Sequence, residues 1–200
     1  MSSNSSIHAY LNWAKERIDE MDAALASLES KAGEVQADAR GKAAQLRAQL
    51  TKKRDDFRAA VEKQAEANEA AWTRAKAQLE SDWSVFEAEL TKYVDSFATQ
   101  LKQQQATFKV QADAQVKAWR DAAEKFRDAG KQFAAERRTE IEASAKQMEA
   151  DAAAAETRLR KLNEAGAQSW SVLMGALKES RASFDRANQA AQEAFQKAAA

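Results

Sequence analysis

Side chains that could catalyse a reaction or bind a metal are few in this chain, and they are scattered. His8 is the only histidine and there is no cysteine, so the sequence contains no zinc-binding cluster. Carboxylates are plentiful, but the Glu-x-x-His motif of di-iron bundles is absent, and no glycine lies in a phosphate-binding motif. His8 and the acidic run of Asp19, Glu20 and Asp22 are typical of a solvated helix surface. We therefore predict no catalytic, cofactor-binding or metal site, and we do not expect an enzyme.

Two basic clusters raise the question of nucleic-acid binding. Lys52–Arg54 is followed directly by Asp55–Asp56, and Arg137–Arg138 is preceded by Glu136. Because these carboxylates offset the clusters and the formal net charge of the chain is zero, the basic face that nucleic acid requires is missing. We expect exposed helical charge and no nucleic-acid partner.

The composition predicts helices throughout. The chain of 200 residues has no proline and five glycines, and its most frequent residues, alanine above all, are the strongest helix formers. No segment alternates apolar and polar residues as a strand does. Regular periodicity and eight phenylalanines and five tryptophans distinguish the chain from a disordered polyampholyte. The predicted fold class is all-α, with long antiparallel helices forming an elongated, coiled-coil-like bundle.

Apolar residues recur at steps of three and four along the chain. A heptad seam runs through Ile7, Leu11, Ala14, Ile18, Met21, Leu25 and Leu28, which is typical of helix-on-helix packing. A second stripe, which we interpret as one helix face, runs through Trp72, Leu79, Trp83, Phe86, Leu90, Phe97, Leu101, Phe108, Trp119, Phe126 and Phe133. Its steps of 7 and 11 residues average near the 3.6-residue turn, so nearly straight helices are expected.

A short pattern occurs twice. Trp83-Ser84-Val85, with Leu90 and Ser96-Phe97, is repeated as Trp170-Ser171-Val172, with Leu177 and Ser183-Phe184, at an offset of 87 residues. Either a helical module was duplicated, or alanine-rich helices of one period resemble each other by chance. Both explanations predict that the two segments pack in the same way.

The order of these features suggests three regions. Residues 1–6 are polar and are expected to form a disordered leader; they are not a secretory signal, because they lack its basic and apolar parts. Residues 7–166 are predicted to be a long-helix region, with breaks near 33–41 and 128–131. Residues 167–200 are predicted to be a C-terminal amphipathic helix after a turn at Asn163–Gly166. The longest uncharged run has 13 residues, too few to span a bilayer, and a cytoplasmic location is expected.

The large apolar residues of the stripe are the expected packing or interaction anchors. Tryptophans could also stack on bases or aromatic ligands, but their helical spacing favours core positions. These anchors are Trp72, Trp83, Phe97, Phe108, Trp119, Phe126, Trp170, Leu177, Phe184 and Phe195.

Alanine-rich, repetitive, proline-free helices of this kind resemble those of bacterial phasins, which coat storage granules. The 11-residue steps are similar to those of exchangeable apolipoproteins, although apolipoprotein repeats are punctuated by proline. From the stripe we predict a non-enzymatic scaffold or interaction protein that binds a helical partner or a second copy of itself. The alternative, which the resemblance implies, is reversible binding to a lipid or granule surface, with residues 170–195 as the contact segment.

Overall fold

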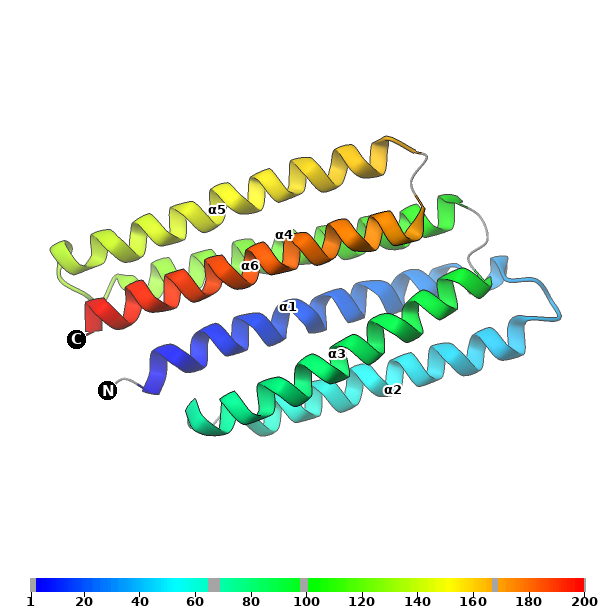
Figure 1. Cartoon of the computed structure of the whole chain (residues 1–200), viewed down its shortest axis with the longest axis horizontal. Coiled ribbons are helices and arrows are strands. Elements are labelled where there is room, and N and C mark those ends of the chain that lie inside the picture. The colour runs from blue at the N-terminus through cyan, green and yellow to red at the C-terminus, as the bar shows by residue number, and fades with distance from the viewer. Residues whose placement is uncertain (1–2, 65–68, 98–100, 167–168, 200) are drawn as a thin grey trace.

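The computed structural model describes residues 3–64, 69–97, 101–166 and 169–199, and the side chains of most of them. Within these residues all regular structure is helical (Figure 1), as predicted. The elements are α1 (Ser3–Ser30), a short 3-10 helix η1 (Ala32–Glu34), α2 (Arg40–Gln64), α3 (Glu69–Phe97), α4 (Leu101–Gly130), α5 (Ala135–Glu164) and α6 (Trp170–Ala199).

The helices lie along one long axis and alternate in direction, which gives an elongated bundle (Figure 1). Helix α1 lies in its middle, in contact with α4 and α6 on one side and with α2 and α3 on the other. Helix α5 packs on α4 and α6, away from α1. The bundle therefore consists of α5, the α4–α6 pair, α1 and the α2–α3 hairpin, stacked in that order.

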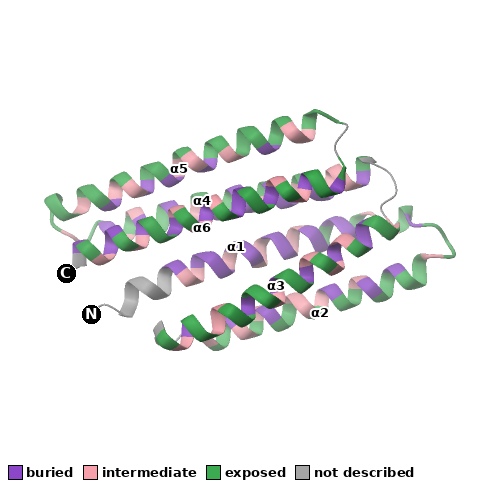
Figure 2. Ribbon diagram, viewed as in Figure 1, coloured by how far each residue is buried: buried purple, intermediate pink, exposed green. Residues whose placement is uncertain are grey.

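Burial follows this layering. In Figure 2 α1 is largely buried, whereas α5 is largely exposed or intermediate. Helix α5 buries one narrow seam against α4 and α6, spaced at heptad steps: Ile141, Ala145, Met148, Ala152 and Leu159. Among the described side chains, Val85 and Val172 are the exposed large hydrophobic residues, so the stripe is satisfied inside one chain. None of the described helices combines the length and the apolarity needed to cross a membrane.

The turns around α5 follow the local sequence. Gly166, with a φ of 72°, adopts the left-handed conformation that glycine favours after a helix end, and the carbonyl of Ser169 accepts the first bonds of α6 from the N–H groups of Val172 and Leu173, both at 3.1 Å. Gly130 is the last residue of α4. A Cβ there would lie 2.9 Å from Ile141 Cγ2, so glycine permits the close approach of α5.

Three expectations about helix boundaries need correction. Helix α1 begins at Ser3, so residues 3–6 form its first turn instead of a leader. Serine and asparagine are tolerated in a first turn, where the N–H groups have no helical partner. Further helix ends occur at Gln64 and Phe97, where no glycine or proline marks them. The stripe from Trp72 to Phe133 is accordingly divided among α3, α4 and the α4–α5 turn, because a lone long helix could not bury it.

The repeated pattern does not follow the helix boundaries. Trp83 lies in the interior of α3, whereas Trp170 is the first residue of α6. Both tryptophans are buried and both following valines are exposed. The similar burial with different positions in the helix favours a shared packing pattern over duplication of a helical unit.

Candidate functional site

The ten expected anchors lie in the interior of the bundle. Nine are buried, and Phe97 is partly buried against Tyr93, with ring centroids 5.1 Å apart. Trp72 stacks on Tyr10 at 5.5 Å, and Trp119 meets Phe184 edge-on at 5.6 Å. The anchors do not form a single site, because they are distributed along the whole bundle.

A buried network of charges joins the central helix to its neighbours. Glu20 of α1 is fully buried and accepts hydrogen bonds from Arg181 Nε of α6, at 3.1 and 3.2 Å to its two oxygens. Arg181 Nη2 lies 2.6 Å from Glu87 Oε1 of α3, and its guanidinium lies 4.8 Å from the centre of the Trp83 ring. Arg181 thus connects three helices.

A second arginine extends the network along α1. Arg17 donates to both carboxylate oxygens of Asp185 on α6, at 2.9 and 2.8 Å, and to Glu16 at 2.7 Å. Gln115 of α4 donates to Glu20 at 2.9 Å. Burial opposes the charge on each guanidinium, but the surrounding carboxylates outweigh it and hold the pKa of both arginines above its usual value. Both arginines therefore stay charged.

Glu16 is a buried carboxyl group of this network whose charged form is disfavoured. It is fully buried, and burial, with the charge of Glu20 beside it, raises its pKa well above 4.5 despite the opposing effect of Arg17. One of its oxygens has no hydrogen-bond partner. The ionised form of Glu16 is consequently a cost to the folded state.

We expect Glu16→Gln to stabilise the protein at neutral and higher pH. A carboxyl group whose pKa is higher in the folded than in the unfolded state gives its full contribution to the free energy of unfolding below the unfolded pKa. This contribution is lost as the pH rises through the folded pKa. The free energy of unfolding of Glu16→Gln should therefore be close to that of the wild type near pH 4.5 and should exceed it increasingly at higher pH. Urea unfolding of both proteins from pH 4 to pH 8 measures this difference, and a difference that does not change with pH would contradict the expectation.

The sequence interpretation missed this network. Glu20 was expected on a solvated face, but it is fully buried, whereas Asp22 of the same run is half-buried and pairs with Arg54 and Arg58 of α2. The heptad seam accounts for one buried face of α1. Because α1 lies between two layers, it buries further faces that the seam does not mark. These two ion pairs with Asp22 also mean that part of the basic cluster around Arg54 is used inside the fold.

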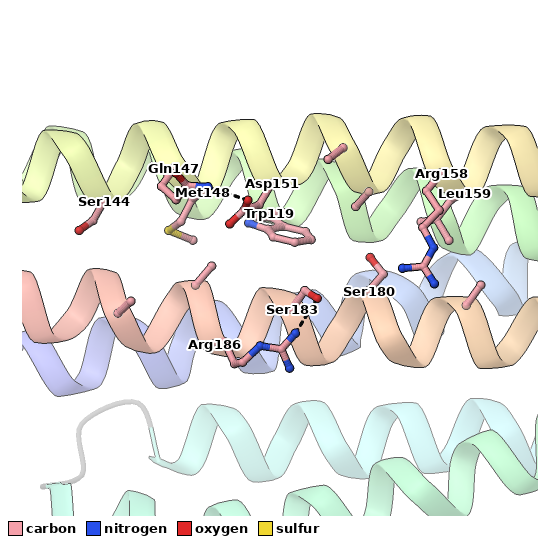
Figure 3. A pocket seen from close by; sticks show the side chains of 15 residues that line it. Trp119, Ser144, Gln147, Met148, Asp151, Arg158, Leu159, Ser180, Ser183 and Arg186 are labelled. Carbon is pink, nitrogen blue, oxygen red and sulfur yellow. Dashed lines mark hydrogen bonds between the residues drawn. The ribbon is translucent and has the colours of Figure 1, made fainter.

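The bundle has a groove between α5 and α6. Its volume is about 560 Å³, within the range of small-molecule sites, and Trp119 of α4 lies between the two helices (Figure 3). Alanines and serines form most of its walls. Its lining includes Trp119 of α4, Met148, Asp151, Ala154 and Arg158 of α5, and Ser180, Ser183 and Arg186 of α6.

Two of the buried polar atoms that lack a hydrogen-bond partner belong to residues lining this groove. The indole Nε1 of Trp119 and the hydroxyl of Ser180 are buried and have no hydrogen-bond partner. Arg158 pairs with Glu179 across the groove, whereas Arg186 is exposed and donates to Ser183 Oγ at 2.9 Å. The groove can therefore bind a molecule by apolar contact and by hydrogen bonds.

Comparison with known proteins adds no functional assignment. Among the side chains that the structure describes, no group of three or more His, Cys, Asp or Glu is placed to hold a metal ion; the side chain of His8 lies outside them. No model of a protein family matches the chain, and neither a curated protein nor a solved structure matches it. The groove and the ion network are therefore the features that support a function.

Proposed function

We propose that this protein is a non-enzymatic interaction protein, which binds a partner molecule in the groove between α5 and α6. The observation that carries the proposal is the pair of buried polar atoms without partners, Trp119 Nε1 and Ser180 Oγ, in the wall of this groove. Buried polar groups are normally hydrogen-bonded, and a bound molecule would supply the missing acceptors. The ion network around Arg181 keeps α6 in register with α1, and so fixes one wall of the groove.

Native mass spectrometry of the full-length chain, isolated without detergent from the cells that produce it, tests this proposal. We expect a bound molecule that adds to the mass of 22.1 kDa. Ala154→Phe should remove it by filling the groove, because Ala154 is exposed and its replacement leaves the core unchanged. Lys178→Gln, at an exposed position of α6 outside the groove, should retain it. A protein without added mass, or with added mass retained in Ala154→Phe, would contradict the proposal.

A second candidate function is reversible binding to a lipid or granule surface. The amphipathic pattern of α6 supports it: its apolar face holds Trp170, Leu173, Leu177 and Phe184, and Lys178 and Arg186 are exposed on its polar side. In the closed bundle that apolar face is buried. Surface binding therefore requires α6 to leave the bundle, which breaks the contacts of Arg181 with Glu20 and Glu87.

The two functions predict different results in a flotation experiment with anionic liposomes. If the groove is the binding site, the wild-type protein should stay at the bottom of the gradient, because the side chains that the structure describes form no broad exposed apolar face in the closed bundle. If α6 is a surface anchor, the wild type should float, and Arg181→Ala should float more readily because α6 is held less firmly. Flotation of this kind would favour the second function over the first.

A further inference from the structure

The shape of the groove between α5 and α6 restricts what can occupy it. The two helices remain in direct contact with each other, whereas a docked helix would need a gap of about 10–12 Å between them. From Ser144 to Leu159 the groove follows 16 residues of α5, which span a length of about 22 Å at the rise of an α-helix. A long and slender molecule fits this space, and a folded segment does not.

The groove has both polar and apolar lining residues. The α6 wall places Ser180 and Ser183 opposite Asp151 of α5, with Trp119 between the helices (Figure 3). Alanines of both helices supply its accessible apolar surface, and the buried side chains of Trp119, Met148 and Leu159 lie beneath them. An occupant that buries an unbranched apolar chain gains from contact with this surface.

Polar atoms in the groove favour an acceptor on the occupant. The indole Nε1 of Trp119 can only donate a hydrogen bond, and the Ser180 hydroxyl can donate one; both are buried without a partner. Trp119 is held in place by its edge-on contact with Phe184. Ligand oxygen atoms would satisfy these donors.

Charge selects the kind of acceptor. Within the described residues Arg186 has no carboxylate within ion-pair distance, and its recorded hydrogen bond is to Ser183. Arg158, by contrast, is paired with Glu179, and Asp151 accepts a hydrogen bond from Gln147 at 2.8 Å. Guanidinium groups bind carboxylates through two parallel hydrogen bonds, so Arg186 provides a site for an anionic head group.

We propose that the groove between α5 and α6 binds a slender amphiphile with a carboxylate head group and an unbranched apolar chain, whose carboxylate lies at Arg186 and accepts hydrogen bonds from the unpartnered donors of Trp119 and Ser180 as well. This inference rests on the proposed function, since it names the class of molecule that the groove receives. It commits to a free carboxylate amphiphile rather than to the surface of a membrane.

Calorimetric titration of the full-length protein with dodecanoate, below its micelle concentration, tests the inference. We expect binding of one molecule per chain. Arg186→Gln should weaken it by about 10-fold to 100-fold, the effect of removing a hydrogen bond to a charged group. Ala154→Phe should abolish binding and Lys178→Gln should leave it unchanged. Circular dichroism melting of each variant checks that the fold is kept, and a second groove variant, Ser144→Leu, replaces Ala154→Phe if that protein does not fold.

Three results would overturn the inference. Dodecanoate that does not bind, or that binds equally well to Arg186→Gln, removes the carboxylate site. Dodecyltrimethylammonium that binds as tightly as dodecanoate shows that the apolar chain alone is recognised. If native mass spectrometry nevertheless finds another class of molecule that Ala154→Phe removes, the proposed function stands and only this assignment fails; if neither experiment finds an occupant of the groove, both fail.

Discussion

Replacing Arg181 with alanine is expected to lower the free energy of unfolding by about 3–5 kcal/mol, because it leaves buried carboxylates without their partner. Arg181 is almost completely buried and binds Glu20 of α1 and Glu87 of α3. Removing its guanidinium leaves the fully buried Glu20 with one remaining donor, Gln115. Urea unfolding monitored by circular dichroism measures the loss.

The matched control for this variant is Arg158→Ala. Arg158 also pairs across two helices, with Glu179 of α6, but both side chains are exposed, and exposed ion pairs contribute about 0–1 kcal/mol. If the two variants lose equal stability, the buried network is not the connection that holds α6 to α1 and α3. Arg181→Lys adds a second comparison, since lysine keeps the charge but lacks the planar fork that contacts both carboxylates.

Trp83→Ala should cost about 3–5 kcal/mol, the usual range for truncating a buried tryptophan. Its ring lies between Phe86, at 5.9 Å, and the guanidinium of Arg181, at 4.8 Å. Trp170→Ala should also lower the melting temperature, but less, because Trp170 is the first residue of α6 and a helix end can fray.

Thermal unfolding of both variants, with Val172→Ala as the control, checks this prediction. Val172 is 46% exposed, and exposed substitutions usually change stability by less than about 0.5 kcal/mol. Unchanged stability in the tryptophan variants, together with loss of binding, would instead identify these rings as contacts for a partner.

The sequence predicts the fold class well because several local signals agree. Helix formers dominate, proline is missing, and the seam through Met21, Leu25 and Leu28 marks residues that the structure buries. The end of α5 at Glu164, just before Gly166, and the start of α6 after Ser169 are also predicted, since a left-handed glycine and a capping residue leave local signatures.

The number of chain reversals is harder to predict. The ends of α2 at Gln64 and of α3 at Phe97 carry no glycine or proline, and the apolar spacing continues across them. A helix that continues and a helix that folds back have the same period along the sequence, so periodicity does not separate them. The decision depends on burial between helices that are distant in sequence.

The ion network and the groove depend on the same long-range packing. Glu20 and Arg181 are separated by 161 residues, and each looks like an ordinary solvated charge in its own helix. Trp119 has the spacing of a core residue and is buried, yet its ring also forms part of the groove wall. The spacing of a residue along the sequence predicts that it is buried, but it does not predict that two neighbouring helices leave a groove beside it.

In this structure the apolar stripe is closed inside one bundle around α1. Amide hydrogen exchange, followed by mass spectrometry on the full-length protein, tests it most directly. Residues 12–28 of α1 should exchange slowest in the chain, near the rate set by global unfolding, because α1 contacts α2, α3, α4 and α6. Peptides from α5, which packs on α4 and α6 at the edge of the bundle, should exchange earlier. If residues 12–28 exchange as fast as α5, or as fast as an unfolded peptide, the closed bundle centred on α1 is contradicted.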